Sequence, residues 1–147
     1  MFRALIVIIG LSVVDWLLCW LVWPWWVPDV TLVSVVLLIA AEPRRWLVLA
    51  ATAGLLAMCW TVPMPAMALA WYGGLGASLR GLGRIIDLGD LRVQLLVIGF
   101  AEALWLALHV WLQSALSISL VGWSVVHIAA TLIAVPWLRR VVLCLAS

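Results

Sequence analysis

Four ionisable residues, Asp15, Glu102, His109 and His127, stand inside long apolar stretches of the sequence. Charged groups are costly in hydrocarbon, so they point to a proton relay, a ligand pocket or bonding between helices. The last of these is structural, because hydrogen bonds between helices fix their register. We expect these residues to form an intramembrane polar site. Glu102 is its leading member, since a mid-membrane carboxylate has no inexpensive structural substitute.

Further polar residues share helical faces with these four. At 100° per residue, Glu102, His109 and Gln113 lie within about 20° of one line. These faces are expected to point inward, where the depths of Asp15 and His127 make a contact between them geometrically possible. Three more stripes have the same spacing: Ser124, His127 and Thr131; Ser12, Asp15 and Cys19; Thr31 and Ser34.

Motifs for catalysis or metal binding are missing from the sequence. The three cysteines are scattered, and no Cys-x-x-Cys, His-x-x-x-His or Ser-His-Asp order occurs. Gly81 and Gly83 form a Gly-x-Gly that is not followed by the Gly-Lys-Ser/Thr of a phosphate loop. We predict no enzyme activity, no metal and no cofactor. The net charge of +2 also gives no nucleic-acid footprint.

The elements that position these residues must lie in a membrane. The 147 residues are 69% hydrophobic and 10% charged, whereas a soluble domain needs roughly a quarter of its residues charged. Eight arginines fall in four clusters, and the three nearly uncharged stretches between them are 4–43, 46–79 and 93–138. One crossing takes about 20 residues, so each stretch holds two crossings and all four clusters face one compartment.

The predicted architecture is an all-α integral membrane protein, one domain over 1–147, with six helices in three hairpins. The turns are expected at 23–29, 63–65 and 114–119, and both termini are expected in the cytoplasm. The second and fourth helices are short, either because they are buried among neighbours or because they are half-helices of the transporter kind. The expected spans are 4–22, 30–42, 46–62, 66–79, 93–113 and 120–138.

Small residues and one charged loop are the remaining surface features. Stripes of small residues predict close helix packing, chiefly internal. The loop from Arg80 to Arg92 also holds Arg84, Asp87 and Asp90. It is expected to lie near anionic lipid or to hold a cytoplasmic partner. The stripes are Ala50, Gly54 and Ala57; Ala66, Ala70 and Gly74; and Gly99, Ala103 and Ala107.

This layout resembles the bacterial rod-shape-determining membrane protein family MreD. The likeness covers most of the chain through short apolar motifs. They are Trp23-Pro24-Trp25 leading to Pro28-Asp29, the run Val30 to Ala41 before Pro43-Arg44-Arg45, Gly54 on the next helix, and Val135-Pro136-Trp137-Leu138-Arg139-Arg140.

The resemblance implies a noncatalytic scaffold subunit of the cell-elongation machinery in the bacterial inner membrane. Its partners would be the bitopic protein MreC and, through it or directly, MreB, RodA and a penicillin-binding transpeptidase. The candidate partner-binding residues are Pro28, Asp29, Arg80, Arg84, Asp87, Asp90 and Arg92.

The same family is similar in fold to the substrate-binding S components of energy-coupling-factor vitamin transporters. The alternative function is therefore a vitamin carrier with Glu102 and the two histidines lining its pocket. Those S components usually carry Ala-x-x-x-Ala on the first helix, where this chain has Ala4 and Ile8. The scaffold is accordingly ranked above the carrier.

Overall fold

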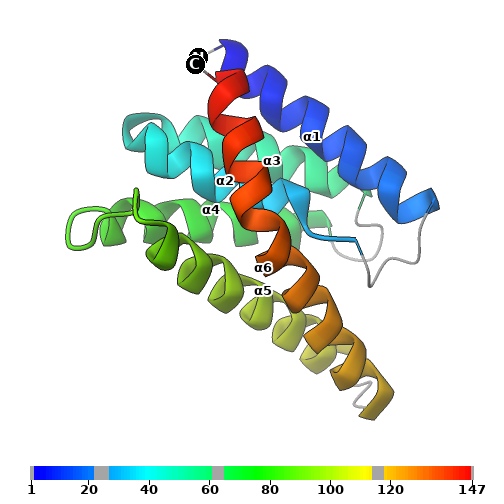
Figure 1. Ribbon diagram of the computed structural model, residues 1–147. Coiled ribbons are helices and arrows are strands. Elements are labelled where there is room, and N and C mark those ends of the chain that lie inside the picture. The colour runs from blue at the N-terminus through cyan, green and yellow to red at the C-terminus, as the bar shows by residue number, and fades with distance from the viewer. Residues whose placement is uncertain (1, 22–26, 61–64, 114–117, 147) are drawn as a thin grey trace.

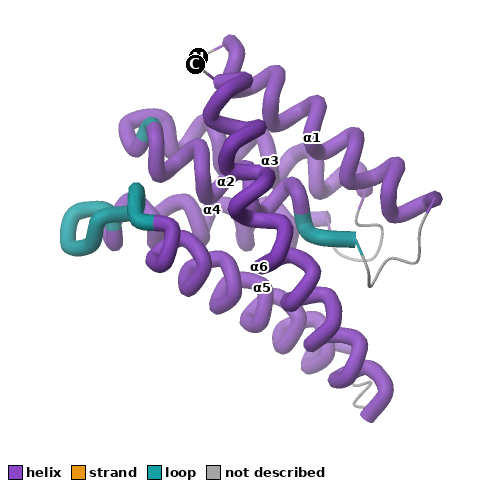
Figure 2. Tube along the Cα trace, in the orientation of Figure 1, coloured by secondary structure: helices purple, strands orange, loops and turns teal. Residues whose placement is uncertain are grey.

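The chain is helical throughout the part that the structure describes. The computed structural model describes residues 2–21, 27–60, 65–113 and 118–146, and these contain helices and loops but no strand (Figures 1 and 2). The three predicted turns lie largely outside the described residues, which leave out 22–26, 61–64 and 114–117. Within the described ranges, the helices are α1 (Phe2–Leu21), α2 (Val30–Ala41), the short 3-10 helix η2 (Pro43–Arg45), α3 (Trp46–Trp60), α4 (Pro65–Leu82), α5 (Leu91–Gln113) and α6 (Ile118–Ala146).

Two of the predicted spans were too short. The fourth helix continues to Leu82, because Leu79 is buried and packing holds the last turn in place. The sixth helix continues through Pro136 to Ala146, because Val142, fully buried, anchors its final turns. The other bounds agree within two residues, the usual uncertainty at helix ends.

Helix α2 forms the centre of the molecule. It contacts α1, α3, α4, α5 and α6, and all its residues from Val30 to Ile39 are buried. A helix that is apolar on nearly every side is a helix buried among others, and the two polar residues of α2, Thr31 and Ser34, are buried with the rest. Of the two explanations offered for its short length, burial among neighbours is therefore the one that holds. At 1.5 Å per residue, its 12 residues span about 18 Å.

Helix α4 packs closely against α3. A Cβ atom built on Gly54 of α3 would lie 3.0 Å from the Cα of Leu69, so only glycine permits this approach. One turn earlier on α3, at Ala50, the two helices are equally close. A Cβ on Gly76 of α4 would lie 2.8 Å from the Cβ of Ala50. The predicted seam of small residues on the third helix is thus a packed contact between α3 and α4.

The opposite side of α4 is open. Helices α4 and α5 make few contacts with each other, and a groove of about 530 Å³ separates them. Ala70 and Gly74 line this groove, and a Cβ on Gly74 would meet nothing within 4 Å. The prediction that the small residues of the fourth helix form an internal seam was therefore wrong. We call this feature the α4–α5 groove.

The segments that carry arginine gather at one end of the molecule. Figure 1 shows both termini, the α2–α3 turn and the α4–α5 loop at this end. Arg139 of α6 donates a hydrogen bond to the carbonyl of Gly89 in that loop, at 3.0 Å. The guanidinium of Arg80 lies 5.7 Å from the ring centre of Trp46, the first residue of α3. We call this end the arginine end.

Three of the helices are long and apolar enough to cross a membrane. They comprise Phe2–Leu21, Leu91–Trp111 and Val121–Leu145, and Val30–Ala41 is a shorter apolar helix. Many large apolar side chains on these helices are exposed, among them Phe100 of α5 and Ile133 of α6. Such faces suit a hydrocarbon solvent and are rare on soluble monomers. The structure is consistent with a membrane protein.

Candidate functional site

The predicted polar residues meet around the N-terminus of α2. Asp29 immediately precedes this helix, and its Oδ1 accepts a hydrogen bond from the amide of Leu32 at 2.7 Å. This is the N-cap arrangement, which satisfies one of the amides that a helix start leaves without a partner. Asp29 was predicted to bind an external partner, yet its side chain serves the chain's own helix. The order Asp-Val-Thr-Leu before an apolar run carries that capping signal in the sequence.

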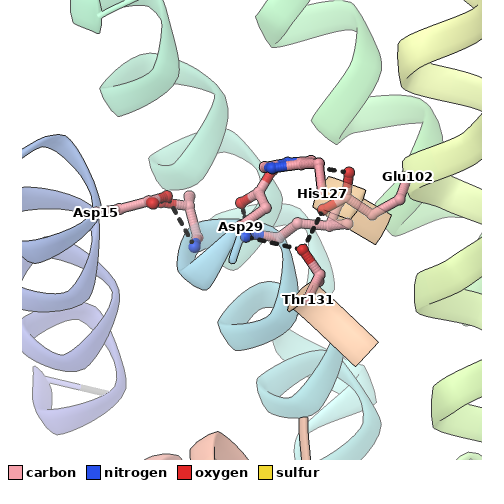
Figure 3. Close-up of polar contacts among 7 residues, drawn as sticks. Asp15, Asp29, Glu102, His127 and Thr131 are labelled. Carbon is pink, nitrogen blue, oxygen red and sulfur yellow. Dashed lines mark hydrogen bonds and ion pairs between the residues drawn. The ribbon is translucent and has the colours of Figure 1, made fainter. Parts of the chain in front are cut away.

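Glu102 of α5 lies at the closed side of this site. It is 1% exposed, and its Oε1 accepts a hydrogen bond from the hydroxyl of Thr131 on α6, at 3.2 Å. The same hydroxyl accepts the backbone N–H of Asp29 at 3.1 Å. Thr131 thus joins α5 and α6 to the start of α2, and Figure 3 shows its hydroxyl near both Glu102 and the backbone nitrogen of Asp29.

His127 completes this group from the next turn of α6. Its Nε2 lies 3.6 Å from the Oε2 of Glu102, an ion pair whenever the imidazole is protonated. We call Asp29, Glu102, His127 and Thr131 the interior network. Its members come from α5, α6 and the residue before α2, and each is oriented by a contact to another helix.

Asp15 of α1 approaches the same helix start from the other side (Figure 3). Its Oδ2 accepts hydrogen bonds from the hydroxyl of Thr31 at 2.8 Å and from the amide of Thr31 at 3.2 Å. The Thr31 hydroxyl also lies 3.3 Å from the Oγ of Ser12. Asp15 thus contacts the start of α2, where the helix N-terminus supplies N–H donors to the carboxylate.

An open cavity adjoins Asp15. It measures about 450 Å³, within the range of small-molecule sites, and lies beyond the N-terminus of α2. Asp29 and Thr31 form its floor, while aromatic side chains form much of its wall. Tyr72 and Trp105 had not been assigned to the site, since nothing in their spacing distinguishes them from core residues. The residues lining the cavity are Ser12, Asp15, Trp16, Cys19, Trp20, Asp29, Thr31, Ala57, Tyr72 and Trp105.

The remaining predicted site residues lie elsewhere. The ring of His109 stacks edge-on against Trp105 with centroids 4.6 Å apart, about two turns from Glu102 on α5 and outside the interior network. Gln113 ends α5, and its side chain lies outside the described part of the chain. Pro28 is half-buried beside Asp29.

The charged loop between α4 and α5 is shorter than predicted. Arg80 lies in the last turn of α4 and Arg92 in the first turn of α5, so both were wrongly placed in the loop. Asp87 and Asp90 cap backbone amides, those of Gly89 at 2.8 Å and Arg92 at 2.9 Å. The two carboxylates therefore stabilise the turn itself.

The site offers hydrogen bonding and proton exchange. Thr131 bridges two acidic residues, and His127 stands beside one of them. Among the described residues, no three His, Cys, Asp or Glu side chains lie together so that they could hold a metal ion. The arrangement is thus a polar cluster between helices, with an aromatic-walled cavity on the Asp15 side.

Comparison with known proteins gives no relative: no family model matches the chain, and neither a curated protein nor a solved structure does.

Proposed function

We propose that this chain is a noncatalytic scaffold subunit of the MreD type. In this proposal it crosses the inner membrane six times with both termini in the cytoplasm. There it holds a bitopic MreC-like protein and cell-wall synthesis enzymes together in the cell-elongation machinery. The mechanism is binding energy between helices in lipid, without covalent chemistry.

One observation carries the proposal: the acidic residue predicted to bind a substrate is enclosed by the chain itself. Both oxygens of Glu102 face residues of α6, Thr131 and His127, and Glu102 does not line the cavity. A carboxylate used in this way fixes the positions of α5 and α6 against α2. This use of Glu102 supports a scaffold, because the interior polar groups hold the helices in place and only the outer faces remain for partners.

The outer faces supply the docking surface. Exposed apolar side chains follow α5 and α6, with Trp111 at 75% exposure and Ile133 at 79%. A single-pass partner helix would bury such residues against its own apolar side, with van der Waals packing as the attraction. Residues at these positions are therefore the ones to probe for contact.

The test is site-specific photocrosslinking in the native membrane followed by affinity purification and mass spectrometry. A photoreactive residue replaces Trp111 or Ile133, and the control is the same residue at Ile39, which is fully buried. Crosslinks from the exposed positions to a bitopic coiled-coil protein or to cell-wall synthases support the scaffold. A chain that is recovered alone from every exposed position, with those proteins present in the membrane, contradicts it.

The cavity favours a second candidate, the substrate-binding S component of a vitamin transporter. Its volume fits a small molecule, and Asp15 with its aromatic neighbours would supply polar and stacking contacts. For a carrier, Asp15→Asn should reduce uptake more than Glu102→Gln, because only Asp15 lines the cavity. Co-purification with paired ATPases and a coupling subunit would favour this candidate over the scaffold.

A further inference from the structure

The α4–α5 groove is lined almost entirely by apolar side chains, with Ser78 the exception. Its walls are side chains such as Trp71 and Leu75 of α4 and Val97 and Leu104 of α5. Toward the arginine end its lining residues are Leu82, Val93 and Ile86, the last of which belongs to the α4–α5 loop.

The dimensions of the groove fit a hydrocarbon chain. The α4 residues that line it run from Ala70 to Leu82, about 18 Å at 1.5 Å per residue. This is close to one leaflet, about 15 Å, and well short of the roughly 30 Å that a transmembrane helix covers. The length of the groove therefore matches one acyl chain better than a membrane-spanning helix.

Two arginines are sequence neighbours of residues that line the groove. Arg84 stands between Leu82 and Ile86, and Arg92 immediately precedes Val93, although neither arginine lines the groove itself. Both side chains are exposed, and neither forms an ion pair within the described part of the chain.

The segment from Arg80 to Arg92 keeps a net positive charge despite its two acidic residues. Asp87 and Asp90 stand between the arginines, and each has an oxygen on a backbone amide of the loop. Arg80, Arg84 and Arg92 against these two acids give the segment a net charge of +1. Arg139, bonded to Gly89, adds a second positive charge beside it.

From these observations we infer that the α4–α5 groove is a binding site for an anionic phospholipid. One acyl chain lies between α4 and α5, and the phosphate contacts Arg84 and Arg92. Basic residues at the membrane surface between helices are a recurrent way to bind such headgroups. The lipid would fill the space that α4 and α5 leave between them and connect two helices that touch little. The inference is independent of the scaffold proposal.

Native mass spectrometry of the full chain tests the headgroup. The protein is extracted in mild detergent from membranes that contain phosphatidylglycerol and phosphatidylethanolamine, and retained lipids are counted. We expect phosphatidylglycerol to be retained preferentially, and Arg84→Gln and Arg92→Gln to weaken its retention about fivefold each. Arg44→Gln is the matched control, because Arg44 is exposed on η2, away from the groove.

Two adjacent glycines test the acyl chain. A Cβ at Gly73 or at Gly74 meets no atom within 4 Å, so neither position clashes at the Cβ atom, but only Gly74 lines the groove. Gly74→Leu should therefore abolish retention of phosphatidylglycerol, while Gly73→Leu should retain it. Equal elution profiles and melting temperatures show that both variants are folded.

Three results would overturn the inference. Equal retention of both lipids by the wild type would remove the preference for an anion. Sensitivity to Arg84→Gln with none to Gly74→Leu would mean that only a phosphate group binds, outside the groove. A polypeptide crosslinked from Gly74, with no lipid retained, would assign the groove to a protein partner.

Discussion

The two sides of α4 differ in what small residues accomplish. On one side, α4 lies against α3 so closely that Gly54 has no room for a methyl group beside Leu69. On the other side, Gly74 faces the open α4–α5 groove and has room for a large side chain. A stripe of small residues therefore marks either a closely packed contact or a surface for another molecule, and only the facing helix decides which.

The most damaging change should be Gly54→Leu. The new side chain meets the backbone of Leu69, which cannot move without separating α3 from α4. Overpacking of this kind costs about 2–3 kcal/mol. Reversible unfolding of the purified protein in mixed detergent measures it, with Gly73→Leu as the control. Equal stability of both variants would show that the seam between α3 and α4 is loose, and the contrast between the two sides of α4 would disappear.

The interior network provides a second packed contact to compare with the groove. Thr131→Val keeps the shape of the side chain but removes the hydroxyl shared by Asp29 and Glu102. Two buried partners then lose a hydrogen bond, and unfolding should become easier by about 1–2 kcal/mol. The same unfolding assay gives the value, and Thr131→Ser, which keeps the hydroxyl, should recover most of it. A loss confined to the serine variant would contradict the assigned bonds.

The cap of α2 should have a smaller effect. Asp29→Ala removes the acceptor for the Leu32 amide, a loss of about 1 kcal/mol. Asp29→Asn keeps an acceptor in the same place and should stay within about 0.5 kcal/mol of the wild type. If alanine and asparagine are equally tolerated in the unfolding assay, the side chain of Asp29 does not hold the start of α2.

Gly74→Leu should have the smallest effect on folding. Its side chain enters the groove without a clash, and replacing glycine within a helix lowers the entropy lost on folding. We expect the free energy of unfolding to change by no more than about 0.5 kcal/mol, and any change should be an increase. A large loss in the unfolding assay would mean that α4 and α5 close upon each other in the membrane.

The sequence predicts where the helices lie along the chain but not which helices pack against each other. Uncharged stretches between arginines locate six helices, because length and hydropathy are local properties. The central place of α2 also has a local signal, a run from Val30 to Ala41 that is apolar all round. Helix ends were missed where packing decides them, as at Val142 beyond Pro136.

The sequence predicts which residues belong to the candidate site but not which of them bond to each other. Asp15, Glu102 and His127 do converge on one region, since an ionisable group in an apolar helix is driven toward other polar groups. The bond from Asp29 to Thr131 joins residues 102 positions apart, and no pattern along the chain indicates it. Asp15, not Glu102, lines the cavity, because accessibility depends on which helices close over a residue.

The burial of α2 within the other five helices has a consequence for how the protein is made. Helix α2 is synthesised well before α6, the helix that carries Thr131. Until α6 has been made, the amide of Asp29 lacks its native acceptor, and the apolar faces of α2 lack one of the helices that cover them. Assembly of the interior therefore waits for α6, and a chain truncated before α6 is a natural substrate for quality control.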